Sequence, residues 1–222
     1  PYNYAIGVKG GTSFIYHTVT LEINKYITRS PTDLPNNPPT RCLISLDMVN
    51  FFNEISRSRT IEIIHTHFPH LSGTINLLIK DPTKVFLQLP NGGWSHFHQI
   101  EGLPQGCPLS PVCASLILNS ILSNLDTKLR ERAKSRKIQG HLPDDNEGGI
   151  TNLMAYVDDV NAVVPYEDCL FFCDTFKALT SELGLKLRSD KSKILTSTNN
   201  ISPLPFISNH NRLQLTTCFQ NY

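Results

Sequence analysis

The chain of 222 residues is long enough for one domain, or for one domain and part of another. Apolar residues make up 40% and aromatic residues 9%, which excludes a disordered or collagen-like chain. The net charge is only +1, from 20 Lys and Arg against 19 Asp and Glu. Whole-chain charge therefore neither favours nor excludes a nucleic-acid partner, and any basic surface is local.

The first residue is Pro1 rather than Met, so we expect a piece of a longer protein. No basic stretch followed by an apolar one indicates a signal peptide. The longest uncharged run, 102–125, contains three prolines, so we expect no membrane span and no membrane partner. The six cysteines include no C-x-x-C pair, which favours scattered buried thiols in a reducing compartment. An intracellular location follows, but the sequence does not distinguish nucleus from cytoplasm.

The first predicted strand follows the proline-rich segment 30–40, where RCLISLDMV (41–49) is an apolar run of strand length. A helical pattern begins at Ser58 and stops at Pro69. Two segments, 84–89 and 94–100, flank Asn-Gly-Gly and predict a β-hairpin. His96 and His98 share one face of that hairpin. No Cys is spaced to complete a zinc site with them, so we expect surface or nucleic-acid-facing positions instead.

The clearest predicted helix opens at Ser110-Pro111, with Ser as N-cap and Pro at the first helical position. Its expected buried face carries residues 113, 117, 118, 121, 122, 125 and 129. An acidic, turn-rich loop at 139–149 follows, and then NLMAYVDDVNAVV predicts two short strands around an Asp-Asp corner. A second amphipathic helix is expected at about 167–183, with Gly184 at its C′ position.

Three carboxylates stand out in this pattern. Asp47 ends an apolar strand, where a carboxylate is costly unless it is solvated, paired or bound to metal. Asp158 and Asp159 are adjacent at a hairpin turn that normally takes Gly or Asn. Their mutual repulsion would be relieved by a divalent cation such as Mg²⁺, which prefers oxygen ligands. Taken alone, an Asp-Asp turn is more often solvated than catalytic.

The segment EGLPQGCPLSP (101–111) fixes a sharp turn before the long helix. Gly106 would allow a flat ligand to approach the backbone, and Gln105 offers both a donor and acceptors. An ordinary helix entry explains the same residues equally well.

The order of the motifs resembles the reverse transcriptases. The L-D-x-x-x-F-F-N stretch at 46–53 looks like the first palm motif of that family, GLPQGCPLSP like the second, and AYVDD like the third. GLKLRSDKSKIL (184–195) looks like the fourth, with Arg188 where Asn is usual. GVKGGTSFIYH resembles the end of the fingers region in non-LTR-retrotransposon enzymes, whereas the earlier fingers motif, the primer grip and the thumb are not evident.

The resemblance implies an α+β fold, a fingers–palm fragment of a right-hand polymerase with an antiparallel palm sheet packed on helices. It divides the chain into a partial fingers region at 1–40, a palm at 41–198, and a C-terminal segment of unclear structure at 199–222. The implied activity is extension of a DNA or RNA primer with dNTPs on an RNA template, with two Mg²⁺ or Mn²⁺ ions.

Roles for individual residues follow from the same resemblance. Asp47 and Asp158 would ligate both metals, helped by the Met48 carbonyl, with Asp159 as a looser ligand or an orienting group. The expected nucleotide contacts are Phe52 under the sugar, Gln105 and Gly106 at the nucleotide and template, and Lys191 near the triphosphate, with Lys193 as its rival.

Two other functions stay open at this point. An RNA-dependent RNA polymerase usually has Gly before the Asp pair, where this chain has Val157, and Phe52 would obstruct a 2′-hydroxyl. A non-catalytic, domesticated nucleic-acid-binding module is disfavoured by the presence of all three carboxylates.

Overall fold

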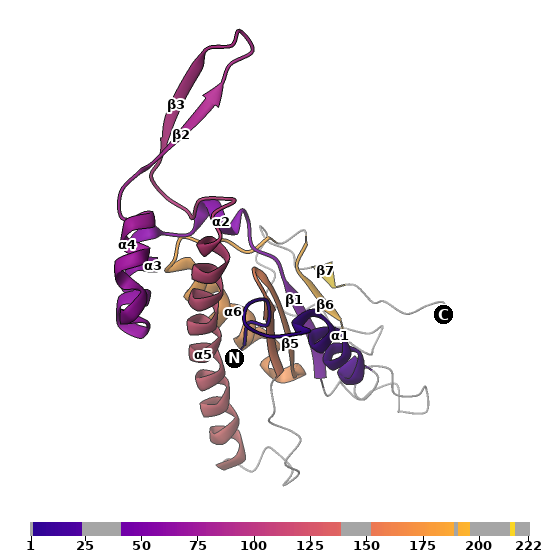
Figure 1. The fold of residues 1–222 in the computed structure, drawn as a ribbon. Coiled ribbons are helices and arrows are strands. Elements are labelled where there is room, and N and C mark those ends of the chain that lie inside the picture. Colours follow the sequence, from indigo (N-terminus) through magenta and orange to yellow (C-terminus); the bar gives the residue numbers. More distant parts are fainter. Residues whose placement is uncertain (1, 24–40, 139–151, 189–190, 196–213, 216–222) are drawn as a thin grey trace.

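A five-stranded sheet organises the fold, with strand order β4-β5-β1-β6-β7. The computed structural model describes residues 2–23, 41–138, 152–188, 191–195 and 214–215 (Figure 1). The strands are β1 (Arg41–Leu46), β4 (Asn152–Tyr156), β5 (Asp159–Pro165), β6 (Lys193–Leu195) and β7 (Gln214–Leu215). All pairs are antiparallel, as expected for the main sheet, except the short β6–β7 pair, which is parallel.

Two long helices cover one face of this sheet: α5 (Leu109–Ile138) and α6 (Cys169–Ser181). The alternation along β1 places Cys42, Ile44 and Leu46 in the core beneath them. In α6, the rings of Phe172 and Phe176 stack with their centroids 6.2 Å apart, and both are fully buried. The seven residues expected on the buried face of α5 are all buried: Cys113, Ile117, Leu118, Ile121, Leu122, Leu125 and Leu129.

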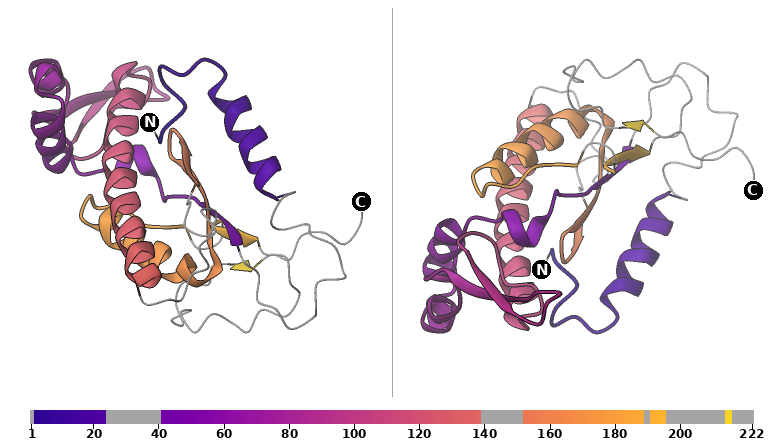
Figure 2. Two further views of the ribbon diagram at one scale, coloured as in Figure 1. Left: turned by 90° about the horizontal axis from the view of Figure 1, so that it is seen from below. Right: turned by 90° about the horizontal axis from the view of Figure 1, so that it is seen from above.

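The opposite face of the sheet carries α1 (Gly11–Glu22), so that the sheet lies between α1 and the α5–α6 layer (Figure 2). The Glu22 carboxylate at the end of α1 accepts from the Asn152 side chain of β4 at 2.9 Å and lies 3.8 Å from Arg41. Before α1, the chain adds a parallel bridge to β4 at Asn3 and Ala155. The N-terminal segment thereby covers the outer edge of β4 near the Asp158 turn.

The segment between β1 and α5 forms further helices and a hairpin, and its buried residues join the same hydrophobic core as the sheet. It contains α2 (Phe51–Glu54), α3 (Arg57–His67), a 3₁₀ turn (Pro69–Leu71), α4 (Ser72–Ile79), β2 (Thr83–Gln88) and β3 (Trp94–Gln99). Strands β2 and β3 pair only with each other and project away from the other elements (Figure 1). A short 3₁₀ turn, Tyr166–Asp168, precedes α6.

Most predicted elements are present, with one correction at the start of α5. This helix begins at Leu109, and the Ser110 hydroxyl donates to the Pro104 carbonyl oxygen at 2.6 Å instead of capping the helix. Gly184 has φ +78°, as expected for a residue that ends a helix. Cys42, Cys113 and Cys169 are buried free thiols. The proline-rich segment, the acidic loop, Cys218 and nearly all of the segment beyond Asn199 lie outside the described residues.

Candidate active site

The three predicted carboxylates come from neighbouring strands at one end of the sheet. Asp47 directly follows β1, and Asp158 and Asp159 lie at the turn between β4 and β5. Because Leu46 pairs with Val160, the chain continues into Asp47 beside the position of Asp159. The antiparallel register therefore brings together carboxylates that are 111 and 112 positions apart in the sequence.

The carboxylates influence one another electrostatically. The pKa of Asp158 is raised, chiefly by burial and further by the charge of Asp47. The pKa of Asp159 is raised by burial, then by the charges of Asp158 and Asp47, while Lys191 acts in the opposite direction. This end of the sheet thus concentrates negative charge. Of the groups that act on these carboxylates, Lys191 is the one that offsets this charge.

The turn that carries Asp158 has an unusual backbone. Val157 has φ +57°, a left-handed conformation that is unfavourable for a β-branched residue. The buried side chain of Asn3 holds this residue: its amide nitrogen donates to the Val157 carbonyl oxygen at 3.0 Å, and its oxygen accepts from the Val157 N–H at 3.4 Å. Asn3 therefore fixes the peptide that precedes Asp158.

Asp47 is held by the segment that resembles the fourth motif. The Ser192 hydroxyl accepts from the Asp47 N–H at 3.2 Å, and the Arg188 N–H donates to the Asp47 carbonyl oxygen at 2.8 Å. The next residue, Met48, forms an antiparallel bridge with Leu187 and is buried. These contacts continue the pairing of β1 and β6 beyond the ends of the two strands. They place Lys191 beside the carboxylates.

The glycine-rich segment packs on the residues that follow Asp47. Gly102 has φ +77°, and a Cβ there would lie 2.5 Å from the Asn53 carbonyl oxygen, so only glycine fits. The Leu103 N–H donates to the Phe52 carbonyl oxygen at 2.6 Å. The Gln105 side chain donates to the Asn53 side chain at 3.3 Å. The segment expected to contact the nucleotide is thereby tied to the turn after β1.

Gly106 and Phe52 differ from their neighbours in accessibility. Gly106 has φ +84° and nothing within 4 Å of its Cβ position, so its backbone faces open space. Phe51 is buried, with 2% of its surface exposed, whereas Phe52 is only partly buried and meets Phe51 edge-on at 5.6 Å between centroids. Of the two rings, Phe52 has surface left for a ligand.

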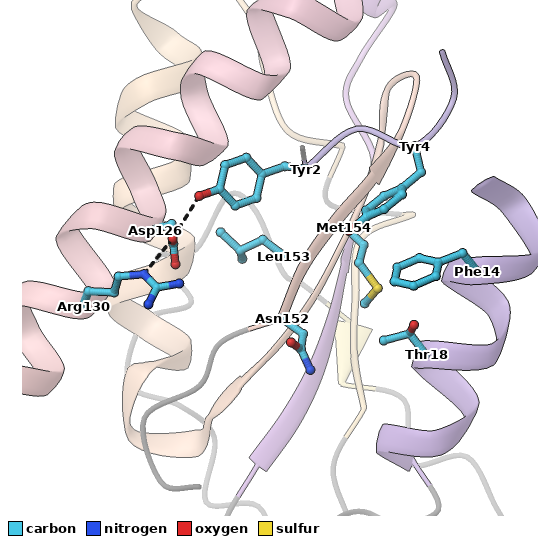
Figure 3. Close-up of a pocket in the computed structure, with 9 residues that line it drawn as sticks. All are labelled: Tyr2, Tyr4, Phe14, Thr18, Asp126, Arg130, Asn152, Leu153 and Met154. Atoms are coloured by element: carbon cyan, nitrogen blue, oxygen red, sulfur yellow. Dashed lines mark hydrogen bonds and ion pairs between the residues drawn. The ribbon is translucent and has the colours of Figure 1, made fainter. Parts of the chain in front are cut away.

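A cavity of about 200 Å³ lies elsewhere, between α1, α5 and β4 (Figure 3). The Tyr2 hydroxyl donates to Asp126 at 2.9 Å, and the Arg130 guanidinium donates to the same carboxylate oxygen at 2.8 Å. Burial and the hydrogen bond to Asp126 raise the pKa of Tyr2. None of the predicted site residues lines this cavity. Its polar contacts fix the start of the segment in which Asn3 reaches the Asp158 turn.

The carboxylate end of the sheet is the candidate position for a metal ion. Within the described parts of the chain, no three His, Cys, Asp or Glu side chains are close enough to hold an ion. The donor chemistry nevertheless suits a hard cation, because Asp47, Asp158 and Asp159 offer carboxylate oxygens, and burial together with the charge of Asp47 raises the pKa of both Asp158 and Asp159. Among the described residues, no helix has the length and apolar character needed to cross a bilayer.

The fold is shared with solved telomerase structures. Apo telomerase from Candida tropicalis, truncated from the C-terminal domain, matches with a TM-score of 0.54 and 13% identity, over 82% of this chain and 40% of that one. Telomerase from Candida albicans in complex with a TWJ fragment of telomeric RNA matches with a TM-score of 0.55 and 10% identity, over 86% of this chain and 31% of that one. The chain thus spans less than half the length of these proteins. The class of fold is the one expected, an α+β fingers–palm fragment of a right-hand polymerase.

The chain belongs to the reverse transcriptase family. The family model described as "Reverse transcriptase (RNA-dependent DNA polymerase)" matches residues 15–208, which is most of the sequence. This match confirms the predicted family, which the description of the model defines as the RNA-dependent DNA polymerases. Among curated proteins, none has a sequence that matches this chain.

Two residues of the site were not predicted from the sequence. Asn3 lies 154 positions from Val157, and nothing in its local sequence marks it. Ser192 lies within the fourth motif, where only the lysines drew attention. The one signal in the sequence was Val157 itself. A valine is unfavourable at a tight two-residue turn, so another part of the chain must hold the turn in place.

Proposed function

We propose that this chain is the fingers–palm portion of an RNA-directed DNA polymerase that extends a primer with dNTPs, most like the enzymes of non-LTR retroelements. One observation carries the proposal: Asp47 and the Asp158–Asp159 pair lie at the same end of the sheet, where burial and then the charge of Asp47 raise the pKa of Asp158 and of Asp159. In a chain of this family, that arrangement fits phosphoryl transfer.

Asp47 and Asp158 would hold two divalent ions, Mg²⁺ or Mn²⁺, with the Met48 carbonyl as a further ligand and Asp159 as a looser ligand or an orienting group. When bound, such ions activate the primer 3′-hydroxyl and stabilise the leaving pyrophosphate. The chain itself keeps the carboxylates in place, through Ser192 and Arg188 at Asp47 and through Asn3 at the turn of Asp158.

The nucleotide would lie between the Phe52 and Gly106 segments. The partly exposed ring of Phe52 and the open backbone of Gly106 support this placement, as does the hydrogen bond that holds Gln105 to Asn53. Lys191 is exposed, and its charge lowers the pKa of Asp159. This proximity supports Lys191, rather than Lys193, as the cation near the triphosphate.

The proposed partners are an RNA template and a DNA or RNA primer. A solved telomerase with the same fold contains RNA, which supports an RNA partner. We also propose that residues 1–40 belong to the fingers, 41–198 to the palm and 199–222 to a further segment. The tight contact of residues 2–4 with β4 means that the first region is not independent of the palm.

Primer extension on an RNA template, with dNTPs or NTPs and with Mg²⁺ or Mn²⁺, tests the proposal. We expect dNTP incorporation that Asp47→Asn and Asp158→Asn abolish, because a lost metal-ligating charge removes transition-state stabilisation. Asp174→Asn is the matched control, since Asp174 is exposed on α6. Extension by either site variant at the parent rate would refute the metal assignment. Preference for NTPs would instead indicate an RNA polymerase, and binding without extension a non-catalytic module.

A further inference from the structure

The β2–β3 hairpin has two faces of different chemistry. The cross-strand pairs Lys84–His98, Phe86–His96 and Gln88–Trp94 alternate with Val85–Phe97 and Leu87–Ser95. Since side chains alternate across a strand, the first set shares one face and the second set the other. We name the first the ring face; its members are Lys84, Phe86, Gln88, Trp94, His96 and His98.

Three rings of this face, Phe86, His96 and His98, form a continuous row that is open to solvent. The Lys84 ammonium lies 5.1 Å from the centroid of Phe86, which is 6.1 Å from that of His96, and His96 is 5.7 Å from His98. Trp94 is 67% exposed and Phe86 59%. A two-stranded hairpin with this much exposed aromatic surface is only marginally stable in water without something to cover it.

Charge indicates what kind of partner fits. No Asp or Glu occurs between Pro82 and Ile100, so nothing within the hairpin neutralises Lys84. Aromatic rings stack on nucleobases, and a nearby cation attracts the phosphate backbone. The ring face combines both features, whereas the opposite face has no charge and carries one aromatic ring, Phe97, beside Val85, Leu87 and Ser95.

The base of the hairpin is fixed to the candidate active site. The buried guanidinium of Arg57 donates to the Gly102 carbonyl oxygen at 2.7 Å, to the Asp81 carbonyl oxygen at 2.9 Å and to the Thr83 hydroxyl at 3.0 Å. Arg57 thus joins the two ends of the hairpin. Immediately beyond Gly102 lies the segment of Gln105 and Gly106, so the hairpin rises from the nucleotide side of the site.

We propose that the ring face binds single-stranded RNA by base stacking and so guides the unpaired template. The proposal rests on the proposed function for the identity of the strand. Bases stack on Phe86, Trp94 and His96, while Lys84 neutralises a phosphate. Such contacts tolerate any base sequence, because every base has a face that stacks.

Trp94 supplies the test, because it is the only tryptophan of the chain. A labelled oligouridylate is titrated with the chain, and its anisotropy and the Trp94 emission are recorded on the same samples. We expect quenching of Trp94 with the same midpoint as the anisotropy change. Phe86→Ala and His96→Ala should each weaken binding about five-fold or more. Lys84→Gln should lower the slope of log affinity against log salt by about one.

Leu87→Ala on the opposite face is the matched control, with 50% of Leu87 exposed, and it should leave the affinity unchanged. Circular dichroism verifies that each variant is folded. Binding without quenching, equal losses from Phe86→Ala and Leu87→Ala, or no binding overturns the proposal. A shift in Trp94 emission that depends on protein concentration in the absence of RNA would also overturn the proposal, because a second copy of the chain would then cover the ring face.

Primer extension separates this proposal from the proposed function. Quenching that persists in inactive Asp158→Asn supports the ring face independently of catalysis. Normal extension by the parent chain without Trp94 quenching overturns only the ring-face proposal.

Discussion

The side-chain amide of Asn3 contacts both the N–H and the carbonyl oxygen of Val157, although the two residues are 154 positions apart. The left-handed conformation of Val157 costs about 1–2 kcal/mol for a residue with a Cβ. Asn3 offsets this cost and holds the turn in the one shape that presents Asp158 beside Asp47. We therefore regard Asn3 as a positioning residue for the carboxylates.

Replacing Asn3 by Ala should lower the free energy of unfolding by about 1–3 kcal/mol, because it leaves two backbone groups of a half-buried turn without their partners. Extension should slow about ten-fold or more as Asp158 shifts. Urea unfolding and single-turnover extension measure the two effects. Adding Val157→Gly should restore part of the stability, because glycine adopts positive φ without strain. An Asn3→Ala variant with parent stability and rate would disprove this role.

Neutralising Asp159 should stabilise the metal-free chain at neutral pH. Its pKa is raised above the ordinary 3.8 by burial and by the charges of Asp158 and Asp47, so the folded state binds this proton more tightly than the unfolded state. Stability from this group is therefore present at low pH and is lost as pH rises through the raised pKa. The free energies of unfolding of the parent and of Asp159→Asn should agree at about pH 3 and diverge, in favour of the variant, at about pH 7. The opposite ordering at neutral pH would show that Asp159 is paired.

Divalent ions should stabilise the parent chain. A ligand that binds only the folded state adds RT ln(1 + [L]/Kd), so the melting temperature should rise with the concentration of Mg²⁺ or Mn²⁺. Asp47→Asn should abolish this rise, and Asp174→Asn should not. A rise of equal size in Asp47→Asn would place the ion elsewhere.

Phe52→Val should relax discrimination between sugars. If the ring lies under the incoming nucleotide, its truncation makes room for a 2′-hydroxyl, and use of NTPs relative to dNTPs should rise about ten-fold or more, or about 1.4 kcal/mol. Phe51→Leu is the comparison, because Phe51 is buried and should lose stability with no change in sugar preference. Kinetics of single-nucleotide addition decide between them. An unchanged preference in an active Phe52→Val chain would remove this ring from the site.

Arg57→Lys should loosen the hairpin. Lysine cannot reproduce the three directed hydrogen bonds of the buried guanidinium, and hydrogen bonds from a charged group contribute about 1.5–3 kcal/mol each. We expect faster hydrogen exchange over residues 83–99 and a loss of at least about 2 kcal/mol. Arg59→Lys is the control, since Arg59 is 45% exposed and its ion pair with Glu62 lies on the surface. Equal protection of the hairpin in both variants would contradict the anchoring role.

The local patterns in the sequence predicted the elements well. The spacing of apolar residues in α5 identified seven buried positions of that helix, though not the buried Ala114, Ser115 and Asp126, and Asn-Gly-Gly identified the β2–β3 turn. The prediction that Ser110 caps α5 was wrong, although a Ser-Pro pair suits the start of a helix. In the folded chain the preceding turn supplies the Pro104 carbonyl, and the hydroxyl bonds to that carbonyl instead.

The site was predictable where its residues form motifs and unpredictable where they act across the fold. Asp47, Asp158 and Gly106 are marked by their neighbours in the sequence. Asn3 and Arg57 act through hydrogen bonds to backbone atoms of remote segments, and such contacts depend on strand register rather than on local sequence. The left-handed Val157 shows that tertiary contacts can override a local preference against that conformation.

The pairing of β1 also determines the order in which this chain can fold. Its neighbours are β5, where Leu46 meets Val160, and β6, where Leu43 meets Leu195. During synthesis β1 therefore has both edges unpaired until more than a hundred further residues have left the ribosome, whereas α5 forms from local contacts alone. The carboxylate end of the sheet is therefore assembled late, and a chaperone that shields β1 in the interval would raise the yield of folded chain.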